Sequence, residues 1–215
     1  MLHEYYDRRA REYEQIYRRD DPVRQREQAE IAAALKTALA GRNVLEVACG
    51  TGYWTAEAAA VAKYIVALDA SPEMLAIARG KGLPAEKVAF REGDAYVLTS
   101  IAGHFDAGLA CFWFSHVPKA RIGEFLDSFH FRLGTGATVF MADNTFVPGV
   151  GGELVARPGL DDTFKLRQLA DGSTYEVLKN YYDTDQLRDF LEPRSTDLRV
   201  NIGSCFWWIS YTVIC

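Results

Sequence analysis

A glycine-rich turn between an apolar segment and a helix-forming segment is the feature that most constrains the fold of this chain. Residues 43–48 (NVLEVA) form a short apolar run, Gly50 and Gly52 follow, and residues 53–61 are rich in alanine. Two glycines at this spacing let the backbone approach a ligand closely, and the next helix directs its free N–H groups toward the same place. The pattern predicts a strand, a turn and a helix of a parallel sheet, with a ligand at the carboxyl end of the strand.

The same alternation of apolar runs and helical segments continues along the chain. Further strands are predicted at residues 64–68, 88–91, 105–111 and 137–142, and helices at residues 71–79 and 119–131. Strands that alternate with helices form crossover units. We therefore predict an α/β fold with a doubly wound, mostly parallel sheet that helices cover on both faces.

The segments on either side of this region differ in character. Asp21 and Pro22 predict the start of a second helix after one at residues 3–18, and Asp171-Gly172 predicts a hairpin between residues 163–169 and 173–178. A helix and two closing strands are predicted at residues 184–191, 198–202 and 205–214. We expect one compact domain composed of an N-terminal helical lid (1–40), a ligand-binding core (41–143), a hairpin insertion that caps the substrate (144–181), and a closing helix with sheet-edge strands (182–215).

Two acidic residues follow the second and third predicted strands. Asp69 ends the second strand, and Asp94 comes just after the third. The carboxyl ends of parallel strands meet at one crevice, where open α/β sheets bind their ligands. A carboxylate at the position of Asp69 suits the two hydroxyl donors of a ribose.

Composition excludes several classes of partner. The formal net charge is −5, and the arginines between residues 8 and 19 are mixed with acids, which is typical of a solvated helix face rather than a nucleic-acid site. No apolar stretch approaches the ~20 residues that a membrane span needs. The cysteines and histidines lack metal-ligand spacing, so we expect no metal site. The charged N-terminus is unlike a secretory leader, and we expect a cytoplasmic protein.

The ligand at the glycine turn is expected to be a nucleoside without phosphate. A dinucleotide site needs a third glycine at position 55, where this chain has Thr55 after the bulky Tyr53 and Trp54. S-adenosylmethionine, which carries an adenosine and no phosphate, therefore fits better. An NAD(P)-dependent oxidoreductase remains the alternative.

Residues 43–143 resemble the class I S-adenosylmethionine-dependent methyltransferases, on the stretches VLEVACGTG (44–52), ALDASPEML (67–75), FREGDA (90–95) and FD (105–106). Residues 6–17 are similar to the helical lid of members that act on small molecules. The segment Ala110-Cys111-Phe112-Trp113 departs from the acid or Asn, Pro-Pro and aromatic of the DNA amino-methyltransferases. The resemblance implies a Rossmann-like, seven-stranded, mostly parallel sheet with an antiparallel last strand, and a small-molecule acceptor.

The resemblance also implies which residues bind S-adenosylmethionine. Asp69 would accept from the ribose hydroxyls, Asp94 from the adenine amino group, and Glu46 would anchor the glycine turn through backbone amides. The full set of implied cofactor residues is Tyr13, Glu46, Ala48, Gly50, Gly52, Asp69, Ala70, Met74, Asp94, Ala95 and Phe112.

Residues for the acceptor and for catalysis are expected from their chemistry. His116 follows the fourth strand and could act as a general base, or could be a histidine without a proton role; Tyr5 could stabilise the sulfonium or pack in the core. Candidate acceptor-binding residues are Tyr6, Trp113, Arg167 and Lys179. The aromatic residues Tyr5, Trp113 and Trp207 hint at a flat aromatic or heteroaromatic acceptor for O- or N-methylation. A non-catalytic protein that binds the cofactor is a further alternative, and the oligomeric state stays open.

Overall fold

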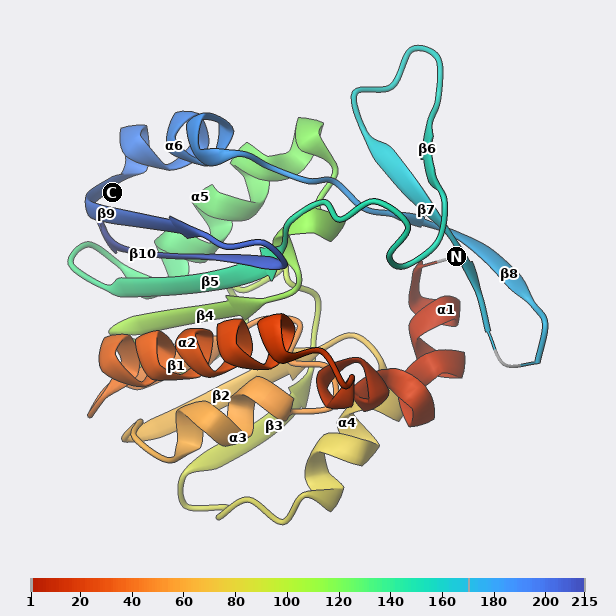
Figure 1. The fold of residues 1–215 in the computed structure, drawn as a ribbon. Helices are drawn as coiled ribbons and strands as arrows, with labels where there is room; N and C mark the ends of the chain where they lie inside the picture. Colours follow the sequence, from red (N-terminus) through yellow and green to blue (C-terminus); the bar gives the residue numbers. More distant parts are fainter. Residues whose placement is uncertain (1, 170, 215) are drawn as a thin grey trace.

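A seven-stranded sheet forms the centre of the computed structural model, which describes residues 2–169 and 171–214 (Figure 1). Its order is β3-β2-β1-β4-β5-β10-β9. The strands are β1 (Asn43–Glu46), β2 (Tyr64–Asp69), β3 (Val88–Glu92), β4 (Ala107–Cys111), β5 (Thr138–Asn144), β9 (Ser195–Ile202) and β10 (Phe206–Val213). Strands β1 to β5 pair in parallel, and β10 runs antiparallel to both β5 and β9. The predicted Rossmann-like sheet with an antiparallel last strand is confirmed.

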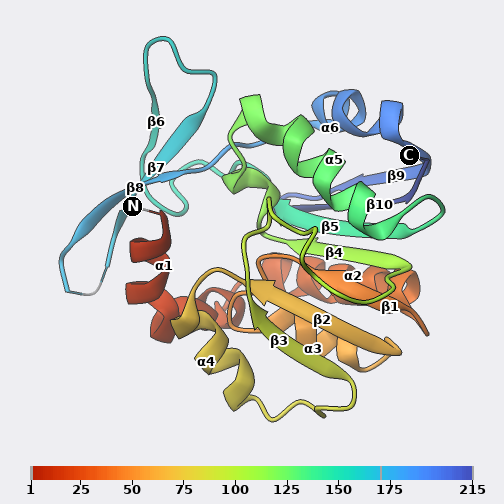
Figure 2. The same cartoon turned by 180° about the vertical axis from the view of Figure 1, so that it is seen from behind.

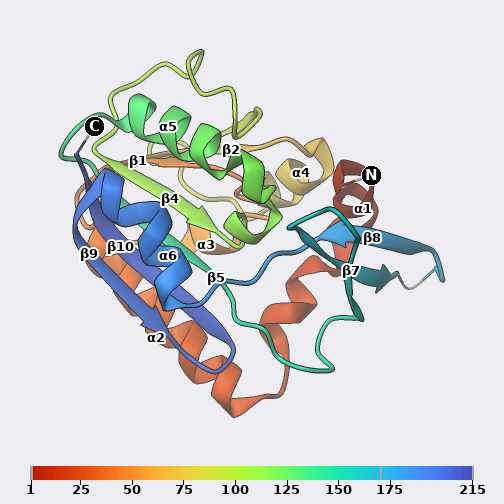
Figure 3. The ribbon, with the colours of Figure 1, turned by 90° about the horizontal axis from the view of Figure 1, so that it is seen from above.

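Helices cover both faces of this sheet, as Figure 3 shows from above. The core on one face includes side chains of α2 (Pro22–Leu39), α3 (Tyr53–Ala59) and α4 (Pro72–Gly80), and the core on the other includes those of α5 (Ile122–Leu133) and α6 (Thr184–Leu191). Alternation along a strand divides the two cores, since Val44 belongs to the first and Leu45 to the second. None of the helices within the described residues is long and apolar enough to cross a membrane.

The capping residues expected from the sequence start two of these helices. The Asp21 carboxylate accepts hydrogen bonds from the amides of Val23 and Arg24 at 3.0 and 3.1 Å. The Ser71 hydroxyl accepts from the amide of Met74 at 3.1 Å. A proline follows each cap, where its missing N–H costs nothing.

The N-terminal segment contains two helices rather than the one predicted. An α-helix, α1 (Leu2–Arg9), is followed by a 3₁₀ helix, η1 (Ala10–Arg18). A 3₁₀ helix has three residues per turn, so side chains three apart point the same way. Tyr13 and Ile16 accordingly line the same cavity, and Tyr17 stacks on Tyr53 with ring centroids 3.9 Å apart.

A second, three-stranded antiparallel sheet lies beside α1, as Figures 1 and 2 show from opposite sides. It consists of β6 (Leu154–Ala156), β7 (Thr163–Gln168) and β8 (Thr174–Leu178). The β7–β8 hairpin was predicted, and Asp171 accepts hydrogen bonds from the amide and hydroxyl of Ser173 in its turn. Strand β6 was not predicted, because its three residues follow the glycines at positions 149, 151 and 152. Tyr5 of α1 packs against Val177 of β8.

Candidate active site

The turns after β1 and β2 are tied together by one carboxylate. Asp69 accepts a hydrogen bond from the Gly50 amide at 2.7 Å and another from the Ser71 amide at 2.9 Å. Gly50 and Gly52 have φ angles of 56° and 75°, in the left-handed region that glycine adopts without strain. The carboxyl ends of β1 and β2 are thereby held around one crevice.

That crevice is a cavity of about 410 Å³, called the larger cavity below. All of the implied cofactor residues except Glu46 and Gly52 line it, together with the acceptor candidates Tyr6 and Trp113 and the candidate base His116. The structure thus brings together residues from the N-terminal helices and from the turns after β1, β2, β3 and β4. Asp69 and Asp94 are the acidic groups of its lining, and Met74, Phe112 and Trp113 are among its apolar ones.

Glu46 and Gly52 have structural positions outside this lining. Glu46 is 1% exposed, burial raises its pKa to about 8, and its Oε2 atom has no hydrogen-bond partner. The Gly50 amide is held by Asp69, not by Glu46 as we expected. Gly52 precedes α3, and a Cβ atom there would lie 3.1 Å from the Cβ of Ala78, so its role is close packing.

Two residues other than glycine have left-handed backbones at the ends of neighbouring strands. Ala48 follows β1 with φ 51°, and Phe112 follows β4 with φ 59°. Such conformations cost roughly 1–3 kcal/mol and persist where the surroundings fix them. The Phe112 amide donates to the Ala142 carbonyl at 2.7 Å, and its ring packs between Trp54 and Phe206. Both residues line the larger cavity, and residue type alone gives no sign of this strain.

A histidine and a tyrosine join helix α1 to strand β8 of the three-stranded sheet. His116 Nδ1 lies 2.7 Å from the Leu178 carbonyl oxygen, and Nε2 lies 2.9 Å from the Tyr6 hydroxyl. A carbonyl can only accept, so Nδ1 carries the proton and Nε2 accepts from Tyr6. Burial, with a further effect of Lys179, lowers the pKa of His116 to about 3. His116 is therefore neutral at physiological pH.

Behind His116 lies a buried ion pair that sequence reasoning missed. Lys179 Nζ donates to Asp143 Oδ1 at 2.8 Å and to the Ser115 hydroxyl at 2.6 Å, and the side chains of Lys179 and Asp143 are 3% and 0% exposed. Burial alone would raise the pKa of Asp143, but the Lys179 ammonium and other contacts hold it below its usual value. Lys179 was expected to bind the acceptor, yet its charge is already neutralised.

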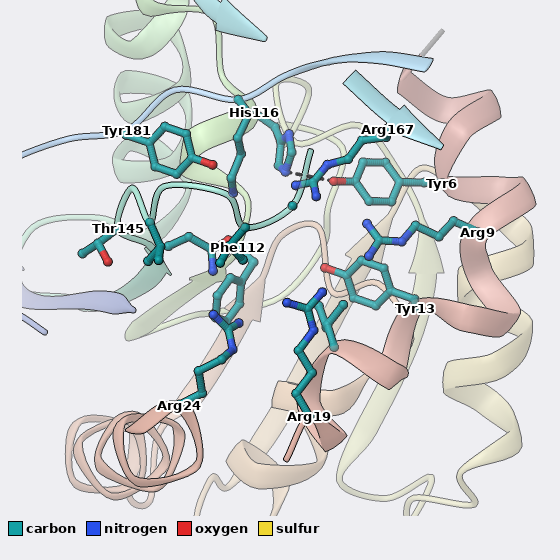
Figure 4. A pocket seen from close by; sticks show the side chains of 16 residues that line it. Tyr6, Arg9, Tyr13, Arg19, Arg24, Phe112, His116, Thr145, Arg167 and Tyr181 are labelled. Carbon is teal, nitrogen blue, oxygen red and sulfur yellow. Dashed lines mark hydrogen bonds between the residues drawn. The ribbon is translucent and has the colours of Figure 1, made fainter. Parts of the chain in front are cut away.

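A smaller cavity of about 80 Å³, drawn in Figure 4, shares part of its lining with the larger one. The two share four lining residues: Tyr6, Tyr13, Phe112 and His116. Cationic side chains dominate the smaller cavity: Arg9, Arg19, Arg24, Arg167 and Lys179. Only Arg167 and Lys179 were expected here. Arg9 and Arg19 lie among acids in the sequence and were interpreted as part of a solvated helix face, and Arg24 was not singled out.

Two aromatic residues that the sequence suggested for the site lie away from both cavities. Tyr5 is 2% exposed and accepts a hydrogen bond from Arg9 at 2.6 Å. Trp207 is fully buried and packs edge-on against Phe114. Neither is part of either lining, so the structure lends no support to the predicted catalytic role of Tyr5. Of the three residues that suggested a flat aromatic acceptor, only Trp113 lines a cavity.

Comparisons with known proteins agree with this fold. A family model described as a methyltransferase domain matches residues 44–136. The DhpI complex with SAH (S-adenosylhomocysteine) matches with a TM-score of 0.76 and 27% identity, covering 99% of this chain and 95% of that chain. The DhpI–SAM–HEP complex, where SAM is S-adenosylmethionine, matches with a TM-score of 0.75 and 27% identity, covering 97% of this chain and 94% of that chain. The PH0226 protein of Pyrococcus horikoshii OT3 shares the fold, with a TM-score of 0.73 and 16% identity. The match covers 94% of this chain and 98% of that chain. The comparison with curated proteins gave no match.

Proposed function

Since the chain is a class I SAM-dependent methyltransferase with SAM as its cofactor, we propose that it methylates a small-molecule acceptor bound in the smaller cavity. The observation that carries this proposal is the junction of the two cavities, at four side chains that belong to both linings. Methyl transfer needs donor and acceptor aligned in adjoining sites that exclude water. The family assignment rules out the nicotinamide oxidoreductase that the sequence had left as an alternative.

The larger cavity suits the cofactor in size and in chemistry. Its volume of about 410 Å³ falls within the range of about 300–1,000 Å³ that is usual for small-molecule sites. We assign the ribose hydroxyls to Asp69 and the adenine amino group to Asp94, with the Ala95 amide toward the ring. Met74 and Ala70 contribute contacts to the adenosine half, and Ala48 and Gly50 line the methionine half. In this assignment the strained backbone at Ala48 allows the close approach.

Bound SAM supplies a methyl group that its positively charged sulfur has already activated. The protein has to align this group and keep water away, for which proximity contributes on the order of 7–11 kcal/mol. Phe112 and Tyr13 lie at the junction of the two cavities, where an aromatic face stabilises a cation by about 0.5–2 kcal/mol. Trp113 lines the larger cavity but not the smaller one.

His116 is assigned a positioning role rather than that of a general base. Its Nε2 already accepts from Tyr6, and its pKa near 3 makes it a poor proton acceptor at neutral pH. The ring holds the Tyr6 hydroxyl at the junction of the cavities. The acceptor oxygen or nitrogen therefore reacts with a lone pair that is available at neutral pH.

Calorimetric titration with SAH tests the proposed function. The wild-type protein should bind SAH, and Asp69→Asn should weaken binding by about 10-fold or more, because hydrogen bonds to a charged group contribute ~1.5–3 kcal/mol. Asp185→Asn, an exposed aspartate of α6, is the matched control and should bind like wild type. Absence of SAH binding to the wild type would contradict the proposal, as would equal affinity of the Asp69→Asn variant.

A further inference from the structure

The smaller cavity concentrates positive charge without neutralising it. We propose that the methyl acceptor is a small anion whose phosphoryl or carboxylate group binds between Arg19, Arg24 and Arg167. The inference rests on the proposed function and adds the chemical class of the acceptor. It follows from the absence of a carboxylate partner for these arginines within the described residues, from the burial of Arg24, and from the segment that covers Arg167.

No acidic residue belongs to the lining of the smaller cavity. Within residues 2–169 and 171–214, no ion pair joins Arg9, Arg19, Arg24 or Arg167 to a carboxylate, although arginines elsewhere pair readily: Arg121 with Glu124, Arg157 with Glu176, Arg188 with Glu192, and Arg194 with Asp127. Figure 4 shows guanidinium groups pointing toward one space from α1, from the segment before α2, from α2 and from β7. The fold places like charges together there and supplies no counter-charge from the described side chains.

Arg24 is the most informative member of this cluster. Its side chain is 9% exposed, its Nε has no hydrogen-bond partner, and its guanidinium lies 4.6 Å from the centroid of the Phe206 ring. It also occupies the first turn of α2, where the helix dipole disfavours a cation. A buried cation that no carboxylate neutralises is costly unless a ligand completes its contacts. An anion in the smaller cavity would supply the missing acceptor.

Arg167 is covered by a glycine-rich segment shaped to its side chain. A Cβ atom at Gly151 would lie 2.5 Å from Arg167 Nη1, so any other residue there would displace the guanidinium. Lys165 holds the segment in place by donating to the Gly152 carbonyl at 2.8 Å and the Val150 carbonyl at 3.3 Å. Residues 150–152 therefore keep the Arg167 side chain directed into the smaller cavity, and Val150 and Gly151 form part of the wall of that cavity.

The size and charge of the cavity favour a compact oxyanion. A water-sized position needs ~10–15 Å³, so about 80 Å³ accommodates the few oxygens of a phosphoryl or carboxylate group. Guanidinium groups match such oxygens in pairs, by two parallel hydrogen bonds. The carboxylate of the cofactor itself carries one charge and cannot neutralise three arginines. The remaining positive charge is left for the acceptor.

Anion titration into the SAH-loaded protein tests the inference. Inorganic phosphate is the probe in one arm and succinate in the other, so the two arms distinguish phosphoryl from carboxylate chemistry. At least one should bind, and Arg24→Gln and Arg167→Gln should each weaken that binding by about 10-fold or more. The affinity of both variants for SAH should change by less than about 2-fold, because neither substitution removes a hydrogen bond to SAH, and the loss of one would weaken binding by more than that. Arg157→Gln, an exposed arginine paired with Glu176, is the control and should bind the anion like wild type.

Thermal unfolding separates a ligand-binding role of Arg24 from a structural one. Without anion, Arg24→Gln should be at least as stable as wild type, because it removes a buried charge that no carboxylate neutralises. The anion that binds should stabilise the wild type more than this variant. The inference is overturned if neither anion binds, or if both variants bind anion normally. It is also overturned if they lose affinity for SAH instead, which would assign the arginines to the cofactor. Failure of the wild type to bind SAH would refute the proposed function itself, a result distinct from these.

Discussion

Removing Lys179 should destabilise the protein strongly, because it leaves a buried carboxylate without its counter-charge. Asp143 is fully buried, and Lys179 is its ion-pair partner at 2.8 Å. Breaking such a pair from one side costs ~3–5 kcal/mol. For a chain of 215 residues each kcal/mol lowers the melting temperature by ~2–4 °C, so Lys179→Met should lower it by about 6–20 °C.

Scanning calorimetry measures this effect against a matched surface pair. Lys36 and Glu57 lie 2.6 Å apart with side chains 38% and 34% exposed, and Lys36→Met should cost no more than ~1 kcal/mol. The double variant Lys179→Met/Asp143→Asn should recover part of the loss, because Asn keeps an acceptor for the Ser115 amide without a charge. If Lys179→Met shifts the melting temperature no more than Lys36→Met does, the reasoning is wrong.

Three further predictions follow from the geometry of the site. Raising the pH from 6 to 9 should lower the free energy of urea unfolding by about 2–3 kcal/mol more for the wild type than for Glu46→Gln. The folded-state pKa of Glu46, about 8, lies above its unfolded value, so the stabilisation by the protonated carboxyl is lost as the pH rises toward 8. An equal pH dependence of the two unfolding free energies would contradict this. The pH profile of methyl transfer should show no step near 6.5, since the pKa of His116 is about 3; a step that His116→Gln abolishes would restore the general base. Gly52→Ala should destabilise the protein by ~1–3 kcal/mol, because Gly52 has a φ of 75° and an added Cβ would contact Ala78. Gly80→Ala, where an added Cβ meets open space, should not destabilise it. Equal melting temperatures of the two variants would refute the packing role of Gly52.

The sequence was sufficient for the seven-stranded sheet and its covering helices because the signals for them are local. The alternation of strands and helices, the Gly50 and Gly52 turn, and the Asp21 and Ser71 caps each reflect a few neighbouring residues. Even the position of Asp69 follows locally, since it ends a strand that must meet the sheet edge. The break between α1 and η1 was missed because tertiary packing, including the stacking of Tyr17 on Tyr53, accompanies it.

The smaller cavity could not be predicted because it depends on contacts between distant segments. Arg19 lies among acidic residues in the sequence, where a solvated helix face was the interpretation, and nothing near Arg24 in the sequence singled it out. They meet Arg167 only after the β7–β8 hairpin packs beside the N-terminal helices. The pairing of Lys179 with Asp143 likewise joins positions 36 residues apart, and neither charge reveals its partner in the sequence.

A crystal structure with SAH and phosphate tests the central claim of two adjoining sites most directly. We predict the ribose hydroxyls within hydrogen-bond distance of the Asp69 carboxylate and the sulfur facing the junction at Tyr6 and Phe112. The phosphate should lie against Arg24 and Arg167. SAH bound elsewhere, or bound with its sulfur turned away from the arginines, would contradict the account.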